Sequence, residues 1–351
     1  MFIYGKPFMK ILENIDLLKY NTFQVPSTTK YFVWIENPDE IFELIKTDIF
    51  KNQKKYFLWN GANTIFTGDF DWLIVKINIK WKEIVANNWN EILVKVWAGE
   101  TWNDFVNRCA DNDFAGAENL AYIPSSIWAT AVQNIWAYGS EAKDIIYEVE
   151  WVNLKTQKIE ILKNNKCNFA YRDSIFKHGL KDNFVITSVT CKLKNFKNWY
   201  KFNCEYEWIT KKIWELWLNT DNMTLKKFIS IITEIRQNKL PDWGKVWTVW
   251  SFFKNPVISD KDWESLSWKY PELKGFSVEW WIKLSAWQLI DLCGFRWKSN
   301  WKVWTYQTHA LILVNEWWAK WKDVLDFSQE IQKAVKSKFW VDLEPEAIFV
   351  D

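Results

Sequence analysis

The chain is organised around one segment, Lys239 to Pro256, which reads KLPDWGKVWTVWSFFKNP. Its second half places Ser251 at the mouth of a turn, before two phenylalanines, a lysine, an asparagine and a proline. Ser, Asn and Pro are ordinary turn residues, so one interpretation is a capped turn ahead of a buried Phe pair. The other is a ligand site, because serine can donate a proton, lysine can hold a phosphate or carboxylate, and asparagine can bind a polar group. The residue types alone leave both interpretations open.

Tryptophan occupies many positions where glycine is expected. The chain has 29 Trp and 10 Gly, whereas average usage would give about 25 Gly. Anomalous Trp lie in turn contexts that need φ > 0 or close backbone approach; examples are Trp97 in VWAGE, Trp136 in QNIWAYG, Trp304 in KVWTY, and Trp317 and Trp318 in NEWWAKWKD. Our hypothesis is that most of them are glycine in the native protein, whose source organism reads one stop codon as glycine. The alternative is a Trp-rich module that stacks on sugars or nucleic acid.

Charge and cysteine content exclude several functional classes. With 45 basic and 43 acidic residues, the net charge is +2, which predicts neither nucleic acid nor a membrane as partner. The N-terminus shows no secretory signal and no apolar run reaches membrane-spanning length, so a cytoplasmic protein is predicted. Five scattered cysteines without a CxxC pair and two histidines predict no metal site.

Strand and helix patterns alternate along the chain. Apolar alternation predicts strands over 31–36, 73–80, 91–100, 145–155, 157–163 and 309–315, and helical spacing predicts helices from Pro38 and Thr101 and over 224–239 and 324–339. Residues 114–141 are long, polar and poor in helical periodicity. In a compact domain this predicts a functional loop, with an irregular surface loop as the alternative.

Four motifs carry a family resemblance over nearly the whole chain. They are the 114–141 segment, YRDSIFK at 171–177, WSFFKNP at 250–256 and LEPE at 343–346. Together they resemble the flavin-dependent UDP-N-acetylenolpyruvoylglucosamine reductases of peptidoglycan synthesis, the MurB family. The chain departs from that family chiefly where Trp replaces glycine, as at Trp59, Trp128, Trp136 and Trp250. Trp102 instead matches a position where the family itself often has Trp.

The resemblance implies an α+β fold. Residues 21–196 would form a two-subdomain FAD-binding domain of the vanillyl-alcohol-oxidase (PCMH) type. Residues 197–223 would form a connector and substrate loop, and 224–351 a C-terminal α+β substrate-binding domain.

The resemblance also implies the site. Cofactor-binding residues would be Asn60, Gly61, Ala62, Asn63, Thr64, Glu118, Asn119, Pro124, Ser125, Ser126, Gln133, Asn134, Ala137, Tyr138 and Gly139. Substrate-binding residues would be Tyr171, Tyr206, Lys239, Asn255 and His309. The catalytic residues would be Arg172, Ser251 and Glu346. If Trp59, Trp97, Trp128, Trp136, Trp247 and Trp250 are truly Trp, the FAD clasp and the serine turn should be blocked.

The implied reaction reduces UDP-N-acetylglucosamine enolpyruvate, a UDP-sugar enolpyruvyl ether, to UDP-N-acetylmuramate. NADPH would reduce FAD, which would pass hydride to the vinyl C3. Arg172 and Glu346 would hold the substrate carboxylate, and Ser251 would protonate C2. A monomeric enzyme is expected. The alternatives are another FAD-dependent oxidoreductase with the same first domain, or a non-catalytic, Trp-rich sugar-binding descendant.

Overall fold

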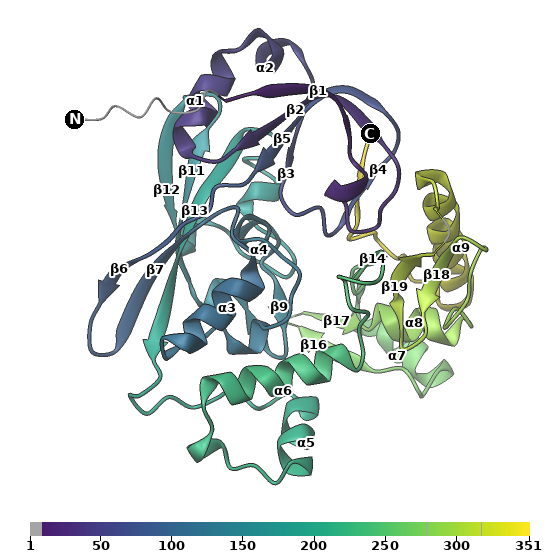
Figure 1. Ribbon diagram of the computed structural model, residues 1–351. Helices are drawn as coiled ribbons and strands as arrows, with labels where there is room; N and C mark the ends of the chain where they lie inside the picture. Colours follow the sequence, from purple (N-terminus) through teal and green to yellow (C-terminus); the bar gives the residue numbers. More distant parts are fainter. Residues whose placement is uncertain (1–8, 279, 317) are drawn as a thin grey trace. The chain divides into compact units, whose positions relative to one another are not determined.

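The computed structural model describes residues 9–278, 280–316 and 318–351 (Figure 1). Trp317, one of the anomalous tryptophans, lies outside the described residues. The chain divides into two compact units that interleave along the sequence. The first unit comprises Met1–Ile15, Thr29–Asn60 and Asp71–Asn238; the second comprises Asp16–Thr28, Gly61–Phe70 and Lys239–Asp351.

A four-stranded sheet opens the first unit. Its order is β1 (Ile11–Asp16), β2 (Thr28–Ile35), β5 (Phe70–Ile77) and β3 (Lys55–Leu58). Two helices, α1 (Pro38–Lys46) and α2 (Asp48–Asn52), follow β2. The start of α1 is fixed by a capping box: the Asn37 side chain accepts a hydrogen bond from the Glu40 backbone N–H at 3.2 Å, and Pro38 takes the first helical position.

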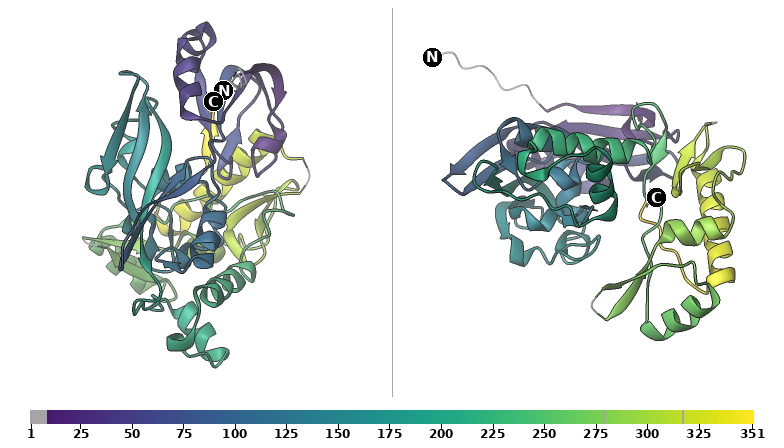
Figure 2. Two further views of the ribbon diagram at one scale, coloured as in Figure 1. Left: turned by 60° about the vertical axis from the view of Figure 1, so that its left-hand side comes forward. Right: turned by 90° about the horizontal axis from the view of Figure 1, so that it is seen from below.

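A six-stranded antiparallel sheet forms the rest of the first unit's framework. Its order is β12 (Lys158–Lys163), β11 (Ile146–Asn153), β13 (Phe184–Asn195), β7 (Glu91–Trp97) and β6 (Lys82–Asn87), with β8 (Phe114–Ala115) also paired to β13. Strands β11, β12 and β13 lie side by side in teal in Figures 1 and 2. The first eight residues of β13 are all buried, as expected of a central strand covered on both faces.

Helices and one short hairpin complete the first unit. Helix α4 packs against β13 and β7, and α6 packs against both α3 and α5. These elements are α3 (Trp102–Asp111), α4 (Ile127–Gln133), α5 (Glu207–Glu215) and α6 (Leu225–Gln237), with the hairpin of β9 (Trp136–Ala137) and β10 (Ser140–Glu141).

The described residues of the second unit form three small sheets and three α-helices. Its sheets are β14 (Thr248–Val249), β19 (His309–Asn315) and β18 (Val303–Tyr306); β15 (Val257–Ile258), β17 (Trp281–Leu284) and β16 (Gly275–Val278); and the parallel pair β4 (Thr64–Phe66) and β20 (Ile348–Val350). Helix α8 (Ala286–Leu292) packs on β19, α9 (Trp321–Phe339) on β18 and α7 (Asp260–Lys269) on β17. Each unit has its own hydrophobic core.

Most elements expected from periodicity are present. The predicted helices correspond to α1, α3, α6 and α9, and the α+β class is confirmed. The 114–141 segment differs from the expectation of a loop, because it contains α4. Residues 127 to 132 of that helix are all buried. A helix buried on every side has no polar face, and so no helical periodicity marks it in the sequence.

The described helices include none that is both long and apolar enough to cross a membrane. All five cysteines carry free thiols. No cluster of three potential metal ligands occurs among the described residues.

Candidate active site

The predicted cofactor segment of the first unit is held by its own buried polar side chains. Glu118 accepts a hydrogen bond from the Gly116 backbone N–H at 2.7 Å and another from the Tyr200 hydroxyl. Burial raises the pKa of the Glu118 carboxyl, and it also raises the pKa of the Tyr200 phenol. Asn119 donates to the backbone carbonyls of Tyr138 and Asn203, at 3.1 and 2.9 Å. These bonds fix the segment's path against the connector.

The start of α4 is the second anchor of this segment. Ser126 caps the helix by accepting from the Ala129 N–H at 3.2 Å, and Ser125 donates to the Ser126 carbonyl at 3.1 Å. Pro124, just before them, receives a 2.9 Å bond from the Asn60 amide at its carbonyl oxygen. Four of the predicted cofactor residues therefore lie together in the first unit: Asn60, Pro124, Ser125 and Ser126.

Gln133 and Asn134 tie the end of α4 to the YRDSIFK motif. Asn134 is left-handed, at φ 45°, and donates to the Ala170 carbonyl at 2.9 Å. Lys177 donates to both the Gln133 side-chain oxygen and the Arg172 carbonyl, each at 2.7 Å. Lys177 thus holds one predicted cofactor residue, Gln133, and the backbone of the predicted catalytic Arg172.

Tyr171 and Arg172 occupy the tip of a two-residue turn. Ala170 and Asp173 close this turn with mutual backbone hydrogen bonds of 3.1 Å. Arg172 has φ 53°, a conformation that non-glycine residues adopt rarely and that clusters at functional sites. The Asp173 carboxylate contacts the His178 Nε2 at 2.7 Å.

Arg236 is a residue of this region that the sequence did not reveal. It lies at the end of α6, donates from Nε to the Tyr122 carbonyl at 2.9 Å, and places its guanidinium 5.7 Å from the Tyr138 ring centroid. The Tyr138 ring in turn meets Tyr206 edge to face at 5.1 Å. Burial lowers the pKa of Arg236. The sequence could have indicated Arg236 only by its position three residues before Lys239, because the residues that Arg236 contacts lie far away along the chain.

In the second unit, two distant motifs lie on paired backbone segments. The Glu346 N–H donates to the Phe252 carbonyl at 2.7 Å, and the Lys254 N–H donates to the Glu344 carbonyl at 2.9 Å. Phe253 and Pro345 form an isolated antiparallel bridge. Ser251 directly precedes this pairing, and Glu346 lies within it. The LEPE and SFFKNP motifs are therefore neighbours, although about 90 residues separate them in sequence.

Two polar side chains of the SFFKNP turn, Lys254 and Asn255, have defined partners. Lys254 forms an ion pair with Glu344, and the Asn255 side-chain oxygen accepts from the Ala286 N–H at 2.9 Å. Phe252 and Phe253 are both buried. The turn therefore does contain the buried Phe pair of the alternative interpretation, together with the predicted site residues Ser251 and Asn255.

In the second unit, the backbone of Lys239 lies next to Thr308, the residue before His309. The Thr308 hydroxyl donates to the Lys239 carbonyl at 2.7 Å. The adjacent His309 ring lies 5.9 Å from the Trp287 ring. Two predicted substrate residues thus share one corner of the second unit.

The predicted cofactor loop continues into the second unit as residues 61–64. Gly61 has φ 67°, and a Cβ there would lie 2.0 Å from the Tyr20 carbonyl oxygen, so only glycine fits. The Ala62 carbonyl accepts from the Thr22 hydroxyl at 2.9 Å. Asn63 donates from its side chain to the Ser251 carbonyl at 3.2 Å and accepts at its own carbonyl from Ile348 at 2.8 Å. The loop thereby reaches the serine turn.

Trp128 is a buried residue of α4 in the first unit, where the family resemblance expects glycine. Its indole is 1% exposed and is packed within 6.4 Å of the rings of Phe57, Trp59 and Phe184. Its Nε1 has no hydrogen-bond partner among the described residues. A glycine at this position would leave that volume open, whereas the indole fills it. At a position where the resemblance expects glycine, this indole therefore adds bulk to the segment that was predicted to bind FAD.

Two family models match separate parts of the chain. Residues 29–161 match the FAD binding domain, and residues 241–350 match the C-terminal domain of UDP-N-acetylenolpyruvoylglucosamine reductase. These two matches define the chain as an FAD-dependent reductase with an FAD binding domain followed by a second domain.

Relatives match over almost the whole chain. UDP-N-acetylenolpyruvoylglucosamine reductase of Flavobacterium johnsoniae is 38% identical over 96% of this chain and 99% of the relative. The protein of the same name from Aliivibrio fischeri is 35% identical over 97% of this chain and 95% of the relative. The chain therefore belongs to the UDP-N-acetylenolpyruvoylglucosamine reductase family, and the resemblance is confirmed.

A solved structure shares the fold. The reductase from Thermus caldophilus aligns with a TM-score of 0.68 at 18% identity, over 98% of this chain and 100% of that one. At this identity the likeness concerns the fold alone.

Proposed function

We propose that the protein is an FAD-dependent, NADPH-driven reductase that converts UDP-N-acetylglucosamine enolpyruvate to UDP-N-acetylmuramate, a precursor of peptidoglycan. The reaction adds a hydride and a proton across the vinyl group. When bound, FAD supplies the redox chemistry. The substrate-side chemistry belongs to the chain's own residues.

Ser251 donates the proton to C2 of the enolpyruvyl group. A serine hydroxyl is a weak acid, so it can serve only where the carbon it protonates is carbanion-like and strongly basic. The observation that carries this proposal is the backbone pairing of SFFKNP with LEPE. It supports a shared role for Ser251 and Glu346, because two segments that are remote in sequence deliver a proton-bearing hydroxyl and a carboxyl to adjacent positions.

Glu346 and Arg172 hold the substrate carboxylate, where negative charge collects as the double bond is reduced. A planar guanidinium can bind both carboxylate oxygens at once. The left-handed turn that presents Arg172 and the Lys177 bond to its carbonyl support a fixed orientation for this residue.

Tyr171, Tyr206, Lys239, Asn255 and His309 bind the rest of the UDP-sugar. Asn60 to Thr64, Glu118, Asn119, Pro124 to Ser126, Gln133, Asn134 and Ala137 to Gly139 shape the cofactor site. Residues 21–196 serve as the FAD-binding domain, residues 197–223 as the connector and substrate loop, and residues 224–351 as the substrate-binding domain. The enzyme works in the cytoplasm as a monomer, and its five free thiols suit a reducing compartment.

Glu346→Gln tests the carboxylate-holding role. The change keeps the shape of the side chain and removes its charge and acidity. Purified protein should lose most substrate-dependent NADPH oxidation while its content of bound flavin stays unchanged. Unaltered turnover in Glu346→Gln would remove Glu346 from the reaction. Asp342→Asn, four residues earlier and exposed, is the matched control and should leave turnover unaffected.

A further inference from the structure

Six tryptophans have a backbone conformation that suits glycine. Their φ angles lie between 52° and 79°, in the left-handed region: Trp199, Trp217, Trp297, Trp301, Trp318 and Trp340. For an L-residue this region crowds Cβ against the following carbonyl, and bulky residues there are outliers. Four of the chain's own glycines, Gly61, Gly116, Gly139 and Gly294, also have positive φ. Tryptophan therefore shares a conformational role with glycine in this chain.

Two helix ends make the comparison direct. Helix α8 ends at Leu292, and Gly294 follows its C-cap residue. The Gly294 N–H donates to the Asp291 carbonyl at 2.8 Å, and the Phe295 N–H donates to the Ile290 carbonyl at 3.2 Å. This pair of bonds is the Schellman motif, in which glycine is the usual left-handed residue.

Helix α5 ends with the same two bonds around a tryptophan. The Trp217 N–H donates to the Trp214 carbonyl at 3.0 Å, and the Leu218 N–H donates to the Ile213 carbonyl at 3.1 Å. The Trp217 side chain is 87% exposed, so burial gives no reason for a tryptophan to end this helix.

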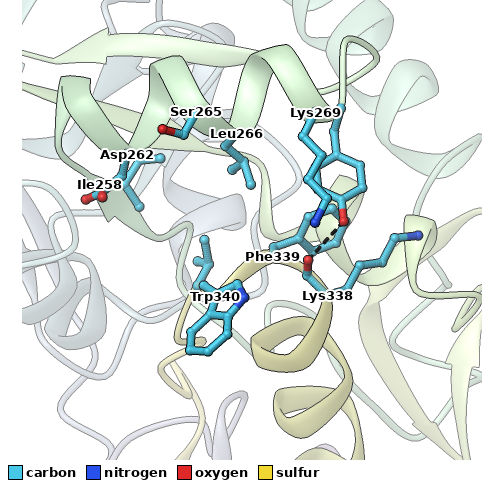
Figure 3. A pocket seen from close by; sticks show the side chains of 10 residues that line it. Ile258, Asp262, Ser265, Leu266, Lys269, Lys338, Phe339 and Trp340 are labelled. Carbon is cyan, nitrogen blue, oxygen red and sulfur yellow. Dashed lines mark hydrogen bonds between the residues drawn. The ribbon is translucent and has the colours of Figure 1, made fainter.

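The longest helix also ends in a left-handed tryptophan. Trp340 follows α9 with φ 59° and ψ 17°, and its N–H donates to the Lys336 carbonyl at 2.9 Å. Figure 3 shows its indole at the end of α9, in a surface pocket that Leu266 and Phe339 also line. The side chain is 80% exposed. A single hydrogen bond made by a left-handed residue is the simpler of the two common helix C-terminal motifs. Glycine is the usual residue at that position.

Five further tryptophans place a buried indole nitrogen where no described residue accepts its hydrogen bond: Trp97, Trp128, Trp151, Trp287 and Trp304. A buried tryptophan normally finds a partner for this N–H. Trp102 does so: it is fully buried, and its Nε1 donates to the Leu120 carbonyl at 2.9 Å. Trp102 also lies in α3 with ordinary helical geometry.

We infer that the protein made by its source organism carries glycine at these eleven positions, six left-handed and five with an orphaned indole, and tryptophan at Trp102. One codon is read as glycine in that organism, and the sequence renders it as tryptophan. Glycine at position 128 removes the buried indole from α4. The segment predicted to bind FAD then no longer carries that bulk. Trp217 and Trp340 follow helix ends, and Trp199 and Trp297 lie in turns, backbone positions that a sugar- or base-stacking role does not require.

Peptide masses of the protein isolated from its source cells test the inference. Peptides covering the eleven positions should carry glycine, and the peptide with Trp102 should carry tryptophan. Tryptophan at the left-handed positions would overturn the inference, as would glycine at Trp102. Tryptophan at the five orphaned-indole positions would overturn it for those residues. None of these readouts depends on catalysis, so failure here is distinguishable from failure of the proposed function.

A second test uses flavin retention by the full-length chain. Two versions are compared after desalting, one as written and one with all eleven tryptophans changed to glycine. The glycine version should retain FAD, measured by its visible absorbance, and the version as written should retain several-fold less. Equal FAD retention by two folded versions would contradict the expectation that the tryptophans hinder FAD binding.

Discussion

At the scale of single residues, the strongest assignment is Ser251, because a distant motif lies against its turn. Ser251→Ala removes the only proposed donor of the C2 proton. In the version with glycine at the anomalous tryptophan positions, we expect a roughly 10²- to 10⁴-fold loss of turnover, the usual range for a lost general acid, with flavin content and melting temperature unchanged. Ser277→Ala, an exposed serine in β16 of the same unit, should retain full activity. Comparable activity in the two variants would exclude Ser251 as the proton donor.

The titration of Lys76 should make the free energy of unfolding depend on pH. Burial, together with the nearby charge of Lys80, lowers the pKa of Lys76 from 10.5 to about 8. Between these two values the unfolded chain holds a proton that the folded chain has lost. The free energy of unfolding should therefore rise as the pH increases from about 8 to 10.5. Below pH 8 Lys76 is charged in the folded chain, so the full free-energy cost of burying its charge lowers the free energy of unfolding.

Urea unfolding of Lys76→Met across that pH window measures this effect. The variant should lose the rise that the parent protein shows. Lys201→Met, at an exposed lysine, should keep it. A parent and a Lys76→Met variant with the same pH dependence would contradict the assignment to Lys76.

At the scale of elements, the ends of α5 and α8 form a matched pair. A left-handed L-residue costs roughly 1–2 kcal/mol, and Trp217 contributes only an exposed stacking contact with Trp214, 5.9 Å between rings. Trp217→Gly should therefore raise the free energy of unfolding by about 1 kcal/mol. Gly294→Trp should lower it by a similar amount, since open space surrounds Gly294 and only the backbone is strained. Opposite signs in chemical denaturation support the account, and destabilisation by Trp217→Gly would refute it.

The sequence predicted local elements well because their signals are local. Asn37 and Pro38 mark the start of α1, and Thr101 caps α3 as expected. Helix α4 was missed because burial on every side removes its polar face. The pairing of Phe252 with Glu346, and the contact of Arg236 with Tyr138, join residues far apart in the chain. No local pattern encodes such pairings; the family motifs indicated the site residues, and the fold shows how they are held.

At the scale of the whole molecule, family membership and the tryptophan pattern lead to one expectation. Relatives align over almost the whole chain, and family models match residues 29–161 and 241–350. A chain with tryptophan at Trp128 would nevertheless carry a buried indole in α4, within the segment predicted to bind FAD. The active protein is therefore expected to be the version with glycine at the eleven assigned positions.

The most direct test is NADPH oxidation in the presence of UDP-N-acetylglucosamine enolpyruvate by a version with glycine at the eleven assigned positions and also at Trp59, Trp136, Trp247 and Trp250. The account predicts turnover that requires the substrate and is lost in Ser251→Ala. A folded, flavin-loaded protein that shows no substrate-dependent turnover would contradict the proposed reductase function and favour another FAD-dependent oxidoreductase on the same first domain.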